Sequence, residues 1–234
     1  KDGKSLTAVC MNNSASSHVY DEKAVKKEGN MEIIIDDEVE SLEDAEKLGV
    51  QVGDFISFDP KTVVSEGGTI KSRFLDDKAS AAVLLAVLKY LKENDVKTKY
   101  KLHFIFTVYE EVGHGGSASI PEGVTEMISV DMGCVGDDLT CTEKMVSICA
   151  KDGGGPYNYD VTSKLMRIAK EQNLDFAVDI YPHYGSDVET TLRAGYELRH
   201  GLIGPGVYAS HNYERTHRNG LENTLKLMLG YIQD

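Results

Sequence analysis

Beyond residue 70, apolar runs of strand length alternate with stretches whose apolar residues recur at helical spacing. The longest such stretch, 78–93, carries Leu84 and Leu88 on one face, and the stretches 160–171 and 221–232 repeat the pattern. Strands that alternate with helices predict an α/β fold, in which helices cover both sides of a largely parallel sheet. The strands are expected at 101–108, 127–130, 176–181 and 196–203, and a shorter helix is expected at 187–194.

The first 70 residues differ in character, because they consist mainly of short β-like runs. Ser41 and Asp44 resemble a capping box and Gly49 resembles a helix stop, so that one short helix fits between the runs. The pair Gly67-Gly68 is a plausible boundary. The sequence therefore predicts a small β-rich domain at 1–70 and a larger α/β domain at 71–234. The β-like runs are 6–11, 31–35 and 52–58.

Charge and composition exclude several functional classes. The 234 residues include 38 acidic and 25 basic side chains, a formal net charge of −13, which repels nucleic acid and anionic membranes. The longest apolar run, 81–88, is too short to span a bilayer, and no leader sequence opens the chain. The four cysteines are scattered without a C-x-x-C pair, which predicts free thiols and a cytoplasmic protein.

Acidic side chains stand at three places where predicted elements begin or end. Asp76 and Asp77 come just before the long helix, Glu110 and Glu111 follow a predicted strand, and Asp131 ends another. Ligands of open α/β sheets bind beyond the carboxyl ends of the strands. Carboxylates gathered there repel one another and lose hydration, and a cation or a shared proton would relieve both effects.

Each acid also has an ordinary structural interpretation. Asp77 is most simply a helix N-cap, and Asp76 is a first-turn charge favoured by the helix dipole. Glu111 alone could be a solvated loop residue, and Asp131 before Met-Gly could form a turn. Because three such sites in one sheet would converge on one crevice, their combination favours a metal site.

A histidine from the end of the chain would complete such a site. His211 lies in the turn-rich segment GVYASHNYERTH before the last helix, where sequence-distant metal ligands often originate, and His217 competes with it. His114, in the glycine turn after the two glutamates, could contact a substrate. The other four histidines, for which no partner or only a loop position is expected, are His18, His103, His183 and His200.

Five motifs occur in an order and at separations that resemble a known family. They are FLDDKASAAVLL, TVYEEVGHGG, ISVDMG, YGSD and YASH…LENTLKLM, and together they span nearly the whole chain. The sequence resembles the M42 metalloaminopeptidases, the glutamyl- and deblocking-aminopeptidase group. The resemblance implies a zinc-exopeptidase-like mixed, largely parallel sheet, with SLEDAEKLGVQVGDFISFDP closing an inserted β-rich domain. It also implies a homo-oligomer, because this family forms dodecameric shells.

The same resemblance implies roles for individual residues. Asp76 would bridge two divalent ions, zinc or cobalt. Glu111 and His211 would complete the first ion's ligands, and Asp131 would bind the second. Glu110 would be the general base of an aminopeptidase that removes N-terminal residues from peptides by a metal-activated water. In the YGSD turn, Ser186 or Asp187 would approach the substrate.

The sequence departs from the family pattern at one ligand. The family has a further metal-binding histidine in an H-x-D motif before the inserted domain, whereas SSHVYD separates His18 from Asp21 by two residues. The family's N-terminal segment is therefore expected to be missing from this chain, which would bind at most one metal tightly and be weakly active or inactive. A dinuclear amidase or deacylase and a non-catalytic assembly module are the alternatives. The glycine-rich KDGGGPYNYD lacks a phosphate-loop frame, and G-x-S-x-G is absent.

Overall fold

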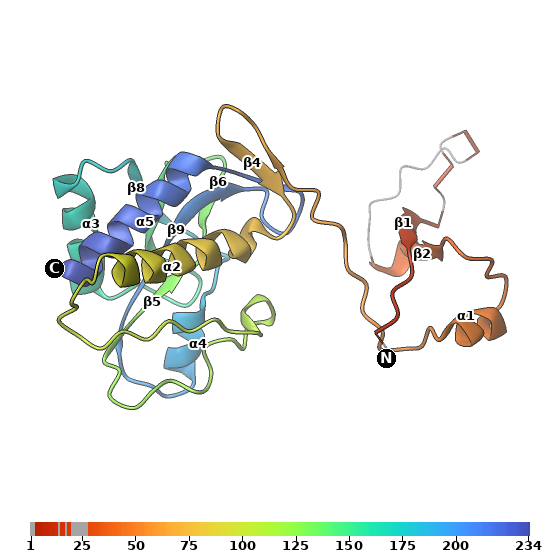
Figure 1. The fold of residues 1–234 in the computed structure, drawn as a ribbon, viewed down its shortest axis with the longest axis horizontal. Coiled ribbons are helices and arrows are strands. Elements are labelled where there is room, and N and C mark those ends of the chain that lie inside the picture. The colour runs from red at the N-terminus through yellow and green to blue at the C-terminus, as the bar shows by residue number, and fades with distance from the viewer. Residues whose placement is uncertain (1–2, 14, 17, 20–27) are drawn as a thin grey trace. The chain divides into compact units, whose positions relative to one another are not determined.

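The chain forms two compact units, Lys1–Ser57 and Phe58–Asp234. A computed structural model describes residues 3–13, 15–16, 18–19 and 28–234 (Figure 1). The boundary between the two units lies at residues 57–58, before the boundary near residue 70 that the sequence predicts. The reason is that the segment ending at Ser72 already pairs with a strand of the larger unit. An assembly role for the first 70 residues stays a prediction.

Among its described residues, the smaller unit has the predicted helix and a strand pair formed by two of the three predicted β-like runs. Ser41 caps the helix by accepting the Asp44 N–H, and Gly49 ends it in the left-handed conformation with φ of 92°. A side chain at Gly49 would be strained in that conformation. The described elements are β1 (Ala8–Asn12), a 3₁₀ turn (Glu28–Asn30), β2 (Met31–Ile35), antiparallel to β1, and α1 (Leu42–Leu48).

The strand predicted at 52–58 is wrong. These residues form no strand, and the side chains of Val52, Phe55 and Ile56 are exposed. Apolar residues favour a strand only when a neighbouring strand takes up their backbone hydrogen bonds. In the described part of the chain nothing pairs with this segment.

The larger unit is organised around one eight-stranded sheet (Figure 1). Its strand order is β3-β4-β10-β9-β7-β8, and β5 and β6 also pair with β9. The strands are β3 (Val63–Val64), β4 (Thr69–Ser72), β5 (Glu126–Val130), β6 (Gly133–Val135), β7 (Val146–Lys151), β8 (Phe176–Ile180), β9 (Arg199–Tyr208) and β10 (Glu214–His217).

The prediction of a mixed α/β fold is confirmed, but that of a largely parallel sheet is wrong. Among the described strands, four of the seven pairings in this sheet are antiparallel. The connections β3–β4 and β9–β10 are short, and short turns join antiparallel strands only. Five short strands, namely β3, β4, β6, β7 and β10, had no clear sequence signal. The crossover from β7 through a helix to β8 is parallel, as strand–helix alternation predicts.

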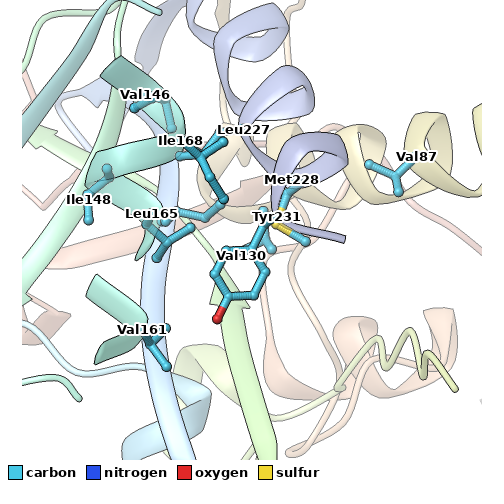
Figure 2. Packing of buried hydrophobic residues seen from close by; sticks show 12 residues of the cluster. Val87, Val130, Val146, Ile148, Val161, Leu165, Ile168, Leu227, Met228 and Tyr231 are labelled. Carbon is cyan, nitrogen blue, oxygen red and sulfur yellow. The ribbon is translucent and has the colours of Figure 1, made fainter. Parts of the chain in front are cut away.

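Helices cover the two faces of this sheet. On one face, Val87, Leu165 and Leu227 come from three helices and belong to the same buried cluster as Ile148 of the sheet (Figure 2). Side chains of neighbouring residues in a strand point to opposite faces of the sheet. Leu202, next to Ile203 of that cluster, therefore packs on the other face, with Val188 of the short helix Asp187–Arg193. No helix among the described residues has the length and apolarity needed to cross a membrane. The helices are α2 (Leu75–Glu93), α3 (Tyr159–Glu171), α4 (Asp187–Arg193) and α5 (Arg218–Gln233).

The strand predicted at 101–108 is also wrong. Phe104 packs at the edge of the core, but Phe106 and Val108 are exposed and the segment has no strand partner among the described residues. It is nonetheless important for the site, because it leads into the 3₁₀ turn Glu110–Val112, which carries the two adjacent glutamates.

Candidate metal centre

The fold brings the predicted acidic residues and His211 together at one end of the sheet. Asp76 lies in the irregular first turn of α2, Asp131 follows β5 directly, and Glu111 lies in the 3₁₀ turn. His211 comes from the connection between β9 and β10. These elements form two groups of potential ligands that share Asp76.

The first group consists of Asp76, Glu111 and His211, whose potential ligand atoms lie within 4.8 Å of one another. His211 Nε2 lies 3.4 Å from Asp76 Oδ2 and 3.3 Å from Glu111 Oε2. Charge-assisted hydrogen bonds are shorter, at about 2.7–2.9 Å. Two ligand atoms held tetrahedrally about 2.05 Å from a zinc ion would stand about 3.3 Å apart. The donor types and the spacing therefore fit a divalent ion.

The second group consists of Asp76, Asp77 and Asp131, again with ligand atoms within 4.8 Å of one another. Asp131 is 6% exposed, and its Oδ1 is buried without a hydrogen-bond partner in the structure described. Asp77 Oδ1 is in the same situation. Buried oxygens without donors are unfavourable unless a cation or proton satisfies them.

The crowding of these carboxylates shifts their protonation. Burial, with the Glu111 charge next in importance, raises the pKa of Asp76 to about 6. Burial and the neighbouring Asp76 charge also raise the pKa of Asp131 well above its usual range. Burial raises the pKa of Glu110 to about 7, and the charges of Asp187 and Glu111 add to this effect. A bound cation would favour the ionised form of each group.

Removing one of these charges should stabilise the metal-free chain. A carboxyl group whose pKa is higher in the folded than in the unfolded chain stabilises the fold below pH 4, and this contribution is lost as pH rises through the folded pKa. We therefore expect Asp131→Asn, measured in a chelator, to raise the free energy of unfolding by at least about 1 kcal/mol at pH 8. The gain should be smaller at pH 5. A loss of stability at pH 8 in urea titrations would contradict this.

Glu214 holds the two sides of the centre together, and no sequence signal pointed to it. Its side chain is 1% exposed, and Oε2 accepts the backbone N–H groups of Leu75 and Asp76. Its Oε1 accepts the N–H of His211 at 2.9 Å. One carboxylate of β10 therefore fixes the backbone of two residues that supply potential ligands.

The chain resembles known proteins over almost its whole length. The family model of the M42 glutamyl aminopeptidases matches residues 1–227. The chain belongs to the M42 family. YhfE of Bacillus subtilis (strain 168), provisionally named an aminopeptidase, is 44% identical over 99% of this chain and 67% of its own length.

Two solved structures show the same fold as this M42 chain. The aminopeptidase APDkam598 from Desulfurococcus kamchatkensis has a TM-score of 0.84 at 21% identity, over 100% of this chain and 66% of that one. The TET1 peptidase of Pyrococcus horikoshii, described as assembling into a tetrahedron or a large octahedral shell, has a TM-score of 0.73 at 24% identity, over 86% and 61%. The M42 chain thus spans about two thirds of the length of these relatives.

The glycine turn of the M42 chain packs tightly against the start of α4. Thr107 Oγ1 donates a hydrogen bond to Asp187 Oδ2 at 2.7 Å, and a Cβ at Gly115 would lie 2.1 Å from Asp187 Oδ1. Of the two YGSD residues expected near the centre, Asp187 therefore reaches the turn that carries Glu110. Ser186 is buried and bonds to the Tyr157 hydroxyl at 2.8 Å instead.

The other histidines do not join the two groups. His217 caps α5, accepting the Asn219 N–H, and its Nε2 is 2.8 Å from the carbonyl oxygen of Gly67. His18 is exposed and lies in the smaller unit, whereas Asp21 lies outside the described residues. His200 packs against Tyr157, and the remaining three, His103, His114 and His183, are exposed.

A cleft of about 480 Å³ adjoins the centre through Tyr184. The Tyr184 hydroxyl donates to the carbonyl oxygen of Met132 at 3.3 Å, next to Asp131, so that one side chain lies between the cleft and the second group. The cleft is lined by Gly153, Gly154, Gly155, Pro156, Tyr184, Glu189, Leu192, Arg193 and His200.

Proposed function

We propose that this chain carries the catalytic centre of a metal-dependent aminopeptidase that removes N-terminal residues from peptides. The observation that supports this most directly is the pair of ligand groups sharing Asp76, each with its ligand atoms within 4.8 Å. Membership of the M42 glutamyl aminopeptidase family supports the same reaction class.

The residues of the first group, Asp76, Glu111 and His211, would hold one zinc or cobalt ion. Asp76 and Asp131 would take part in holding a second. When bound, such ions lower the pKa of a nucleophilic water and polarise the scissile carbonyl. Asp76 would contribute one carboxylate to both positions.

Glu110 is the residue best suited to move the proton. It is half-buried beside the first group, and its raised pKa of about 7 lets it accept a proton near neutral pH. We propose that it takes the proton of the attacking water and later gives it to the leaving amine. The charge of Asp187, which Thr107 orients, contributes to the raised pKa of Glu110.

A requirement for a free N-terminus on the substrate distinguishes an aminopeptidase from a dinuclear amidase or deacylase. A dinuclear amidase or deacylase would use the same proton acceptor and would hydrolyse blocked substrates as well. The test is hydrolysis of one peptide in unblocked and N-acetylated forms, with Co²⁺ or Zn²⁺ added. Cleavage confined to the unblocked peptide supports an aminopeptidase, and equal cleavage of both forms favours the amidase.

Full activity should need more than this chain. The M42 relatives are longer, and the second ligand group of the described residues contains carboxylates but no imidazole. We propose that a histidine outside residues 1–234 supplies it. A protein extended to the length of the relatives should therefore hydrolyse peptides at least tenfold faster than the 234-residue chain. Equal rates would contradict this part of the proposal.

We also propose that the protein self-assembles, as the Pyrococcus horikoshii TET1 peptidase does. Val52, Phe55 and Ile56 expose apolar side chains in succession, which is typical of a surface covered by a partner. A non-catalytic assembly module would use the same surface but would bind no metal.

Phe55→Asp should weaken that assembly. Losing a large apolar anchor and burying a charge typically raises the dissociation constant by about 30-fold or more. Size-exclusion chromatography with light scattering should show a smaller species for Phe55→Asp and an unchanged one for the neighbouring exposed Asp54→Asn. An unchanged mass for Phe55→Asp would exclude this segment as an interface.

A further inference from the structure

The glycine-rich motif KDGGGPYNYD, which the proposed reaction does not use, forms one wall of the cleft beside the metal centre. Gly153 donates its N–H to the carbonyl oxygen of Tyr184 at 3.0 Å, and Gly154 donates to the Asp152 carboxylate at 2.9 Å. A Cβ at Gly154 would lie 2.0 Å from both carboxylate oxygens of Glu189. The loop therefore approaches Glu189 so closely that a side chain at this position would displace that carboxylate.

Glu189, on α4, is a buried carboxyl group that lines the cleft. It is 6% exposed, and Asp152 at the start of the glycine loop is 2% exposed and accepts the Tyr157 hydroxyl at 2.6 Å. Burial, with the neighbouring Asp152 carboxyl next in importance, raises the pKa of Glu189 to about 8. A buried carboxylate is unfavourable unless it is paired, so a cation in the cleft would replace the proton that Glu189 otherwise holds at neutral pH.

The basic side chains of the cleft do not balance these two acids. Of the described residues that line it, Arg193 and His200 are the basic ones. Arg193 Nη2 lies 3.3 Å from Glu189 Oε2, but 71% of the Arg193 side chain is exposed, and such solvated ion pairs are weak. Burial lowers the pKa of His200, which is therefore neutral near pH 7. The lining thus offers one exposed guanidinium for two buried acids.

The rest of the lining suits a long side chain with a charged end. Pro156, Leu192 and Tyr184 line the cleft, and the methylene stems of lysine and arginine pack along such apolar surface. Tyr184 also links the cleft to the metal centre, because its hydroxyl donates to the carbonyl oxygen of Met132, next to Asp131. The cleft and the centre are therefore separated by the length of one tyrosine side chain.

We propose that this cleft receives the side chain of the first residue of the peptide substrate and that Glu189 makes it select lysine and arginine. The first side chain of a peptide lies next to the free amine and the scissile bond, so it must enter a cavity that adjoins the centre. A basic side chain would supply the positive charge that the cleft lacks, whereas a glutamate side chain would face two acids. The inference rests on the proposed aminopeptidase function and names its substrate class.

The test is kcat/KM for unblocked tripeptides that differ only in their first residue, which is Lys, Arg, Leu or Glu. The protein is metal-loaded and extended to the length of the M42 relatives. We expect the Lys and Arg peptides to exceed the other two by at least about tenfold, and Glu189→Gln to remove most of this advantage. The Leu peptide should change less than about threefold, because the amide keeps the size of the side chain but not its charge. Glu197→Gln, an exposed glutamate just after α4, is the matched control and should alter no rate.

Arg193→Gln gives a second measurement should Glu189→Gln not fold, because the Arg193 side chain is largely exposed. Removing the guanidinium that competes for Glu189 should raise kcat/KM for the Lys peptide by at least about threefold and leave the Leu peptide unchanged. A decrease shared by all four peptides would mean that Arg193 only supports the wall of the cleft. A loss confined to the Glu peptide would mean that the cleft selects acids. Either result would overturn the proposal.

Failure of the selectivity and failure of the proposed function give different results. If the Leu peptide were hydrolysed as fast as the Lys peptide, the selectivity would be refuted and the aminopeptidase function would stand. A protein that hydrolyses none of the four peptides would refute the function, and calorimetry with free lysine and leucine would then decide on the cleft. Tighter binding of lysine that Glu189→Gln abolishes supports the proposal, and equal binding of the two amino acids overturns it.

Discussion

Replacing Glu110 with Gln should lower kcat for an unblocked peptide by about 10²- to 10⁴-fold in a protein extended to the length of the M42 relatives. The amide keeps the size of the side chain but cannot accept the proton of the attacking water. Because Glu110 belongs to neither ligand group, bound metal should stay within twofold of the unaltered protein. Steady-state kinetics with metal analysis of the same samples would measure both effects.

The pH profile separates this role from a structural one. The pKa of Glu110 is raised to about 7 in the metal-free chain, and a bound cation lowers it. The rate of the metal-loaded protein should fall as pH decreases through this lowered pKa, and Glu110→Gln should abolish that limb. Glu122→Gln, an exposed acid in the following loop, is the control. If Glu110→Gln kept more than a tenth of the activity, Glu110 would not be the base.

Glu214→Ala should weaken both the fold and metal binding. It would leave the N–H groups of Leu75, Asp76 and His211 without their acceptor, and each buried unpaired group is unfavourable by about 1–3 kcal/mol. We expect the free energy of unfolding of the metal-free chain to fall by about 3 kcal/mol. Losing a partner that orients metal ligands typically lowers affinity 10- to 100-fold, and Zn²⁺ binding should decrease by that amount.

Two variants define what the Glu214 carboxylate contributes. Glu214→Gln keeps an acceptor oxygen and should recover part of the stability, but its NH₂ group would face a backbone donor. Glu222→Ala, an exposed glutamate on α5, should change neither quantity. Urea titration and Zn²⁺ dialysis are the measurements. If Glu214→Ala bound Zn²⁺ as tightly as the unaltered chain, Glu214 would not be needed to hold Asp76 and His211 in place for metal binding.

The parts of the fold that depend on local sequence could be predicted. The helix at α1 follows from Ser41 and Gly49, and α3 and α5 follow from apolar spacing that tertiary packing then uses. The segments at 52–58 and 101–108 have strand-like composition but form no strand, because a strand exists only with a partner. Local sequence carries no information about that partner.

The candidate centre was predictable to a similar extent. The acidic motifs and His211 were recognisable because their order resembles that of a family, and the fold brings them together. Glu214 was not recognisable, because its role depends on contact with Leu75, 139 positions away. The interpretation of Asp77 as the helix cap is wrong, because α2 begins at Leu75 with Phe74 in the cap position, and the buried Asp77 oxygen could be located only in three dimensions.

Because Asp76 belongs to both ligand groups, the occupancies of the two positions are thermodynamically linked. If binding of the first ion changes the affinity for the second by some factor, binding of the second changes the affinity for the first by the same factor. A binding curve for an ion at one position would therefore shift with the occupancy of the other. The supply of divalent ions would then act on both positions together and not on each alone.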